Sequence, residues 1–204
     1  MLFIARILSY LFHPIFAPLI SVYILFQLPL LINFKLTDFY KTYVYIAMAV
    51  NLVVAPLLIL IYFKKAGIIE SIEMKSVRER RTPYLMTLLF YLFTLALLFF
   101  IHFPTVYLKI FLGASLVIAV LYFFTFLNFK VSAHLSGLGG ICGMLFVIAM
   151  IFKVELTTLM ILFILLSGVI ASARLALKAH SLDELLVGFL LGFSAPFLVY
   201  VPLF

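Results

Sequence analysis

The chain alternates long apolar runs with short polar segments, and the apolar runs are long enough to cross a membrane. With Asp, Glu, Lys and Arg taken as boundaries, seven charge-free runs of at least 18 residues remain: 7–34, 42–63, 82–108, 110–129, 131–152, 156–173 and 185–204. A membrane-spanning helix needs about 20 apolar residues, and hydrocarbon offers unpaired backbone groups no partner, so such segments must be helical. The pattern predicts an all-α polytopic transmembrane bundle of about seven helices, forming a single transmembrane domain over residues 1–204.

Composition agrees with this fold class and excludes several others. Hydrophobic residues make up 68% of the 204 residues, charged residues make up 10%, and the mean hydropathy is +1.36. Soluble domains carry about 25% charged residues, so disorder, a soluble nucleic-acid binder and a disulfide scaffold are excluded; Cys142 is the only cysteine. Runs such as 85–100 lack the period-two alternation of a membrane β-barrel. The net charge of +7 fits basic loops beside anionic lipid, so the expected partner is the lipid bilayer and not a nucleic acid.

Prolines predict where the apolar runs break. The first run holds Pro14, Pro18 and Pro29, so we expect a kinked or broken helix there. This run is too long for a cleaved signal peptide, and no small-residue cleavage site follows it. Pro104 ends the third run, and residues 153–155 form a very tight connection.

The dense polar clusters all fall on one side of the predicted membrane domain. We call the side that holds the N-terminus side X, and seven crossings place three loops on it: 64–81, 128–134 and 172–184. The remaining loops fall on the opposite side, side Y. This parity predicts one shared site at one membrane interface. The clusters supply the following residues: Lys75, Arg78, Arg80, Arg81, Ser132, His134, Arg174, His180, Asp183 and Glu184.

These residue types suit a phosphate ligand. Arg offers a planar fork to phosphate oxygens, and Lys offers a point charge. A histidine supported by a carboxylate can act as a nucleophile or base, and a second histidine can protonate a leaving oxygen. Since no carboxylate or Cys/His cluster stands at metal-ligand spacing, we expect a site that uses neither a metal nor another cofactor.

Taken in order, the clusters resemble the three signatures of the type 2 phosphatidic acid phosphatase (PAP2) superfamily, which read K-x6-R-P, P-S-G-H and S-R-x5-H-x3-D. Here they read KSVRERRTP (75–83), VSAH (131–134) and ARLALKAHSLDE (173–184), followed by the apolar LLVGFLLG (185–192). The resemblance covers about residues 75–192, and the third motif carries most of its weight. The chain departs from the family's pattern at the following residues: Thr82, Val131, Ala133, Ala173 and Glu184. It therefore resembles a divergent bacterial-type member with a six-helix PAP2-like core.

The resemblance implies a phosphohistidine mechanism. His180 would attack phosphorus, Glu184 would hold and polarise its ring, and His134 would protonate the departing oxygen. The residues implied to bind the phosphate are Lys75, Arg81, Arg174 and Ser132. Backbone N–H groups at the start of the fifth helix would add donors, because helix N-termini favour anions.

Two of these assignments have structural alternatives. Residues 181–184 read S-x-x-E, a capping box that would start the last helix, so Asp183 is the reserve carboxylate. Glu184 is favoured because it stands four residues after His180, where two side chains share a helix face. Arg174 and His180 are six residues apart, about 240° around an ideal helix. We therefore expect a bend or loop between them.

Other polar and small residues near these motifs have structural explanations. Arg78 and Arg80 are expected to anchor their loop to lipid headgroups, and Pro83 disfavours helical geometry at Thr82. His13 is expected to be buried or to line a cavity. The glycines expected to allow close helix packing are Gly137, Gly139, Gly140 and Gly143.

The predicted function is that of an integral-membrane lipid phosphatase. Its substrate would be a lipid phosphate monoester or a polyisoprenyl diphosphate, such as phosphatidic acid, phosphatidylglycerophosphate, undecaprenyl diphosphate or a lipid A phosphate, and transfer to another lipid is the same chemistry. The alternative is a non-catalytic transporter or lipid-phosphate-binding protein with a vestigial pocket, which the irregular first motif motivates.

A multi-pass protein of the cell's inner (plasma) membrane is expected, with two opposing indications of its orientation. Side X carries ten basic residues and side Y four, so the positive-inside rule places the site in the cytoplasm. The family resemblance places the site on the outer face, which is slightly favoured.

Overall fold

The computed structural model describes residues 2–28, 36–71, 74 and 76–200. The chain is 81% helical, and no strand occurs among the described residues. Within these described residues, seven helical segments are long and apolar enough to cross a membrane: Leu2–Gln27, Asp38–Lys65, Arg78–Phe100, Thr105–Phe124, Ala133–Phe152, Thr157–Ala176 and Leu182–Tyr200. The prediction of an all-α polytopic bundle with seven spans is confirmed, and the chain is a multi-pass membrane protein.

The helices are grouped into two compact units. Unit 1 comprises Met1–Pro18 and Lys130–Phe204, and unit 2 comprises Leu19–Phe129. Helix α2 (Ala17–Gln27) begins in unit 1 and continues into unit 2.

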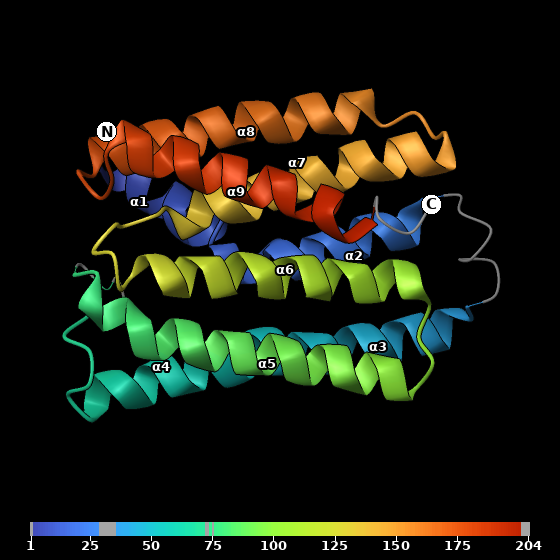
Figure 1. The fold of residues 1–204 in the computed structure, drawn as a ribbon, viewed down its shortest axis with the longest axis horizontal. Helices are drawn as coiled ribbons and strands as arrows, with labels where there is room; N and C mark the ends of the chain where they lie inside the picture. Colours follow the sequence, from blue (N-terminus) through green and yellow to red (C-terminus); the bar gives the residue numbers. More distant parts are fainter. Residues whose placement is uncertain (1, 29–35, 72–73, 75, 201–204) are drawn as a thin grey trace. The chain divides into compact units, whose positions relative to one another are not determined.

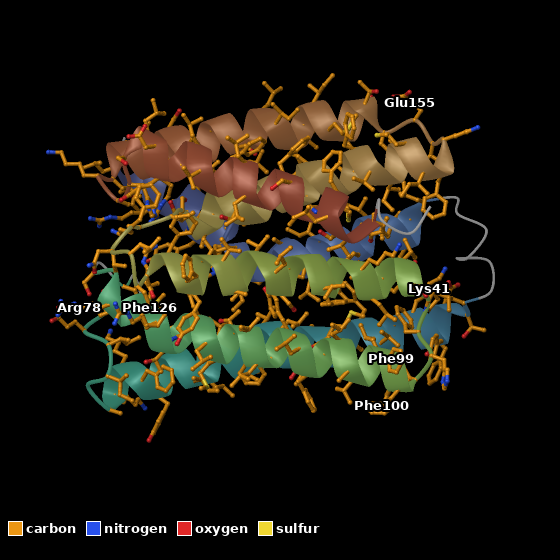
Figure 2. All side chains as sticks on the ribbon, in the orientation of Figure 1. Lys41, Arg78, Phe99, Phe100, Phe126 and Glu155 are labelled. Atoms are coloured by element: carbon orange, nitrogen blue, oxygen red, sulfur yellow. The ribbon has the colours of Figure 1, made fainter. Side chains whose placement is uncertain are left out.

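Unit 1 is built around its most buried helix, α7 (Ala133–Phe152). Helices α8 (Thr157–Ala176) and α9 (Leu182–Tyr200) both pack on α7, and α1 (Leu2–Leu11) packs on α8 (Figure 1). The α7–α8 connection is short, and the Glu155 carboxylate, labelled in Figure 2, accepts the backbone N–H of Thr157 at 2.8 Å. Because α7 and α9 both start where α8 ends, the loops that carry the second and third motifs lie at the same end of unit 1.

The first span is broken, as its prolines predict. Helix α1 ends at Leu11, His13 is extended, and a single 3-10 turn, η1 (Pro14–Phe16), leads into α2. Proline disfavours helical geometry in the residue before it, which explains the extended backbone of His13. Pro29, the other proline expected to break this run, lies outside the described residues.

Glycines bring α7 and α9 unusually close together. A Cβ atom at Gly139 or Gly143 would lie 2.2 Å from a backbone oxygen of α9, and one at Gly192 would lie 2.0 Å from the Ser136 oxygen of α7. At Gly188 the corresponding distance to the Ser132 oxygen is 2.6 Å. No real Cβ atom occupies such positions, so the two backbones touch because both helices lack side chains there.

The other predicted packing glycines differ in their surroundings. Gly137 lies against η1 and the start of α2, where a Cβ atom would be 3.1 Å from the Ala17 Cβ. At Gly140 a Cβ atom would lie 3.9 Å from the Gly192 oxygen, the one contact within 4 Å among the described residues. The expectation of close packing is therefore met most strongly at Gly139 and Gly143.

Unit 2 consists of most of α2 and the following elements: α3 (Asp38–Ala49), the π-helical η3 (Val50–Val54), α4 (Ala55–Lys65), η4 (Arg78–Arg80), α5 (Arg81–Phe100) and α6 (Thr105–Phe124). Helix α5 packs on α6, α4 and η3 (Figure 1). The π-helical turn precedes Pro56, whose missing N–H and ring disturb the regular ladder. Asn51 in this turn donates to the Phe90 carbonyl at 3.2 Å and to the Thr94 hydroxyl, which ties the turn to α5.

Candidate functional site

The loop that carries His180 is fixed by the way α8 ends. Lys178 adopts a positive φ of 51°, the Ala179 N–H bonds the Arg174 carbonyl at 3.0 Å, and the Lys178 N–H bonds the Leu175 carbonyl at 2.9 Å. This pair of bonds is the Schellman motif, which reverses the chain after a helix. The helix that carries Arg174 therefore ends before His180, and the loop between them is the interruption that their spacing predicts.

The His180 ring is held by two acceptors at one nitrogen. Its Nδ1 lies 2.8 Å from Glu184 Oε2 and 3.1 Å from the Lys130 carbonyl oxygen. A carbonyl oxygen can only accept, so Nδ1 carries the proton and the neutral ring has its lone pair on Nε2. The His180 side chain is only 1% exposed and the Glu184 side chain 19%, so this pair is largely shielded from water.

Glu184 also caps the helix that it starts. Its Oε2 accepts the Ser181 N–H at 3.2 Å, and its own N–H points to the Ser181 hydroxyl at 3.4 Å. The capping box predicted from S-x-x-E is thus present, and the same carboxylate oxygen also holds His180. Asp183, the reserve carboxylate, is exposed, and Glu184 is the residue in contact with the ring.

The expected geometry of this pair is wrong in one respect. His180 and Glu184 do not share a helix face, because α9 begins at Leu182 and His180 lies in the loop before it. The ring reaches the carboxylate because the capping box turns the Glu184 side chain toward the N-terminus of α9, where Oε2 contacts both the Ser181 N–H and His180 Nδ1.

Lys130 links the loop before α7 to the loop before α9. Its Nζ donates to the Ala179 carbonyl at 3.0 Å, while its own carbonyl accepts from His180 Nδ1. Two residues further on, the Ser132 N–H donates to the Glu184 carbonyl at 3.1 Å. The second and third motifs are therefore joined by hydrogen bonds that run in both directions.

Ser132 is the N-cap residue of α7 and is completely buried. Its N–H, expected to serve as an anion donor, is already used by Glu184. Its hydroxyl oxygen is buried and has no hydrogen-bond partner within the described part of the chain. Buried polar groups normally find a partner, so this hydroxyl is the group of Ser132 that suits an exogenous ligand.

His134 lies in the first turn of α7 and contacts the N-terminal helix. Its Nε2 is 3.0 Å from the Ser9 carbonyl oxygen in α1, so Nε2 carries the proton in the neutral ring and Nδ1 carries the lone pair. The electrostatic neighbours of His134 are Arg174, His13 and His180. Arg174, in the last turn of α8, therefore joins the histidines of the second and third motifs in one polar cluster.

The first motif belongs to unit 2, and the structure describes it only in part. Lys75 lies outside the described residues. Arg81 begins α5, donates from Nη2 to the Thr125 carbonyl at 3.0 Å and covers the Phe126 ring at 4.5 Å from its centroid. Its Nε is buried and has no hydrogen-bond partner among the residues that the structure describes.

Two expectations for this segment are wrong. Arg80 is not an exposed headgroup anchor: it is 6% exposed and donates to the Met74 carbonyl at 3.2 Å and the Tyr84 hydroxyl at 3.4 Å. Thr82 is helical although Pro83 follows it, and Pro83 itself is tolerated because it stands in the first turn of α5, where a helix needs no N–H donor. Arg78 is exposed at this end of unit 2 (Figure 2).

Comparison of the chain with protein-family models, with curated proteins and with solved structures finds no match in any of the three. Across the described ranges, no three His, Cys, Asp or Glu side chains are grouped so that they could hold a metal ion.

The sequence does not indicate the backbone partners of the two motif histidines, the carbonyls of Lys130 and Ser9. A backbone carbonyl has no residue-type signature. The only available signal was the proline after His13, which predicts a helix end near Ser9 and hence carbonyls without an intrahelical donor.

Proposed function

We propose that this protein is an integral-membrane lipid phosphatase of the PAP2 type, with His180 as its nucleophile. The observation that carries the proposal is the pair of acceptors at His180 Nδ1, at 2.8 Å from Glu184 and 3.1 Å from the Lys130 carbonyl. They keep the proton on Nδ1, which leaves the lone pair on Nε2 for attack on phosphorus. A carboxylate behind an imidazole also stabilises the positive charge that develops on the ring during attack.

In the first step, His180 Nε2 forms a bond to phosphorus and the bond from phosphorus to the lipid oxygen breaks. For this step His134 starts as the imidazolium, with a proton on each ring nitrogen, and its Nδ1 gives one of these protons to the departing oxygen. The Ser9 carbonyl holds the proton of His134 Nε2, so Nδ1 is the nitrogen that exchanges a proton with the substrate.

In the second step, a water molecule attacks the phosphohistidine. His134 Nδ1, now without its extra proton, accepts a proton from the water, and the nitrogen–phosphorus bond breaks to release phosphate. His180 returns to its starting tautomer because Glu184 and Lys130 still hold Nδ1.

The phosphoryl oxygens would be bound by cations and by a hydroxyl. Arg174 and the buried Ser132 hydroxyl are the candidates in unit 1, and Lys75 and Arg81 remain candidates from the first motif. Guanidinium groups suit this role because charge spreads over the equatorial oxygens in the transition state.

The proposed substrates are lipid phosphate monoesters and polyisoprenyl diphosphates, since the chain is a multi-pass membrane protein whose motif residues lie at helix ends. We propose the inner (plasma) membrane as its location and slightly favour the outer face for the site over the cytoplasmic face that the positive-inside rule indicates. Labelling of single cysteines introduced at Lys65 and Lys153 tests this orientation, and the native Cys142 is buried. Protection of position 65 from an impermeant reagent in intact cells would reverse the assignment.

The function is tested by phosphate release from a panel of lipid phosphates by detergent-purified protein. The wild type is expected to release phosphate from at least one member, and His180→Ala is expected to lose this activity while it retains the helical content of the wild type. The matched control is His102→Asn, which replaces an exposed histidine at a positive φ with a residue that tolerates this backbone.

A second candidate is a lipid-phosphate-binding protein without turnover. It is favoured by one observation: the Arg81 guanidinium is engaged with the Thr125 carbonyl and the Phe126 ring of its own unit. Wild-type protein that binds a radiolabelled lipid phosphate but releases no phosphate would favour this candidate over the phosphatase.

A further inference from the structure

The break in the first span brings a third histidine to the second motif. His13 lies outside residues 75–192, which carry the family resemblance. Its ring centroid is 5.5 Å from that of His134, and the two rings are nearly perpendicular at 78°. This is the T-shaped arrangement that aromatic rings prefer.

The position of His13 is set by its own backbone. It caps the 3-10 turn η1, where its Nδ1 accepts the Ile15 N–H at 3.3 Å. This bond holds the ring against the turn and leaves the proton of the neutral ring on Nε2. The side chain is therefore held by the helix break itself.

The same break provides the hydrogen-bond acceptor for His134. Ser9 lies in the last turn of α1, whose final four carbonyls a helix end leaves without intrahelical donors. In an uninterrupted helix the Ser9 carbonyl would accept the N–H of residue 13. Here it accepts His134 Nε2–H at 3.0 Å.

Close packing keeps the break beside His134. Gly137 stands one turn after His134 on α7, and its missing side chain admits Pro14 and Ala17, whose atoms would lie 3.1–3.6 Å from a Cβ atom there. The groups with which His134 interacts electrostatically are His13 from the break, Arg174 from α8 and His180 from the loop before α9.

We propose that His13 is a positioning residue for His134: its ring and the Ser9 carbonyl together hold the His134 ring in the orientation and tautomer that turn Nδ1 to the substrate. This inference rests on the proposed phosphatase function. The N-terminal helix break would then be a working part of the site and not only a membrane anchor.

The test compares two substrates with different leaving groups. A short-chain phosphatidic acid releases an alkoxide that needs a proton from His134, whereas 4-nitrophenyl phosphate releases a phenolate that needs little protonation. His13→Ala is expected to lower kcat for phosphatidic acid by about 2- to 13-fold, the loss expected when a T-shaped ring pair is removed. The loss with the aryl phosphate is expected to be smaller.

His13→Phe keeps the ring contact and guards against a failure of the alanine variant to fold. It is expected to recover most of the phosphatidic acid activity. Equal losses on both substrates in His13→Ala, or a phenylalanine variant as poor as the alanine variant, would overturn the proposal.

A spectroscopic measurement separates this proposal from the proposed function. In protein labelled with 15N-histidine, the His134 resonances, assigned by their loss in His134→Gln, are expected to report a proton on Nε2 in the wild type and a mixture of tautomers in His13→Ala. An unchanged tautomer in His13→Ala would overturn the positioning role even if the enzyme assay fails. Retained activity in His180→Ala would instead overturn the proposed function, whatever the spectrum of His134.

Discussion

Glu184 has two structural contacts that mutations can separate, one with His180 and one with the start of α9. Its Oε2 is 2.8 Å from His180 Nδ1 and 3.2 Å from the Ser181 N–H. A hydrogen bond to a charged group contributes about 1.5–3 kcal/mol. If that energy supports the ring during attack, Glu184→Ala should lower kcat by about 10- to 150-fold.

Two further variants isolate the charge from the cap. Glutamine is accepted at this position of a capping box, so Glu184→Gln should keep the cap and lose only the charge. A neutral hydrogen bond contributes about 0.5–1.5 kcal/mol, so replacing the charged bond by a neutral one loses the difference, about 1–1.5 kcal/mol. The expected loss in kcat is therefore about 5- to 13-fold. Ser181→Ala removes part of the cap, which typically costs about 1 kcal/mol of stability, and should leave kcat within about twofold.

The assay measures initial rates of phosphate release and the thermal unfolding midpoint of each variant in the same detergent. The expected order of kcat is wild type and Ser181→Ala together, then Glu184→Gln, then Glu184→Ala. The unfolding midpoint should fall in Ser181→Ala and in Glu184→Ala but not in Glu184→Gln. If kcat instead followed the unfolding midpoint across the series, Glu184 would be a helix cap and nothing more.

Three other tests follow from the helix packing, from the burial of Arg80 and from the proposed mechanism. Gly192→Ala places a Cβ atom 2.0 Å from the Ser136 oxygen and should force α7 and α9 apart, which lowers the yield of folded protein. Gly168→Ala is the matched control: no atom of the described residues lies within 4 Å of its new Cβ, so it should be tolerated in the same expression and unfolding assays. Arg80→Ala should destabilise unit 2 by about 1–3 kcal/mol because it removes a buried guanidinium that donates to Met74 and Tyr84. Arg78→Ala, at an exposed position, should change the stability by no more than about 0.5 kcal/mol. Equal unfolding midpoints for the two variants would refute the burial of Arg80. Phosphate release should survive EDTA and be blocked by vanadate, which mimics five-coordinate phosphorus; restoration of chelated enzyme by magnesium would contradict the metal-free mechanism.

The fold could be predicted because membrane insertion imposes simple rules on the sequence. Charge-free runs of sufficient length gave the seven spans, and Pro14 gave the break in the first. Helix boundaries were less predictable, because charged residues can stand inside helix ends. Helix α6, for example, begins at Thr105 directly after Pro104 and includes Lys109.

The part of the site that consists of side-chain contacts at short sequence spacing could be predicted from the sequence. The i,i+4 spacing indicated the contact between His180 and Glu184, although the contact is made through a helix cap and not along a helix face. The backbone partners at Lys130 and Ser9 depend on how the helix ends meet in three dimensions. The burial of Arg80 likewise depends on Tyr84, one turn later, and on the folding of the preceding loop, which local sequence does not reveal.

In the proposed mechanism, His180 Nε2 becomes covalently bound to phosphorus. The most direct measurement is to mix the wild-type protein with a lipid phosphate labelled at phosphorus, to quench within one turnover under alkaline conditions that preserve phosphohistidine, and to locate the label by peptide mass spectrometry. We expect label on His180 in the wild type, a larger labelled fraction in His134→Ala when an aryl phosphate loads the site, and no label in His180→Ala. Phosphate release without label on His180, or label on another residue, would contradict this mechanism.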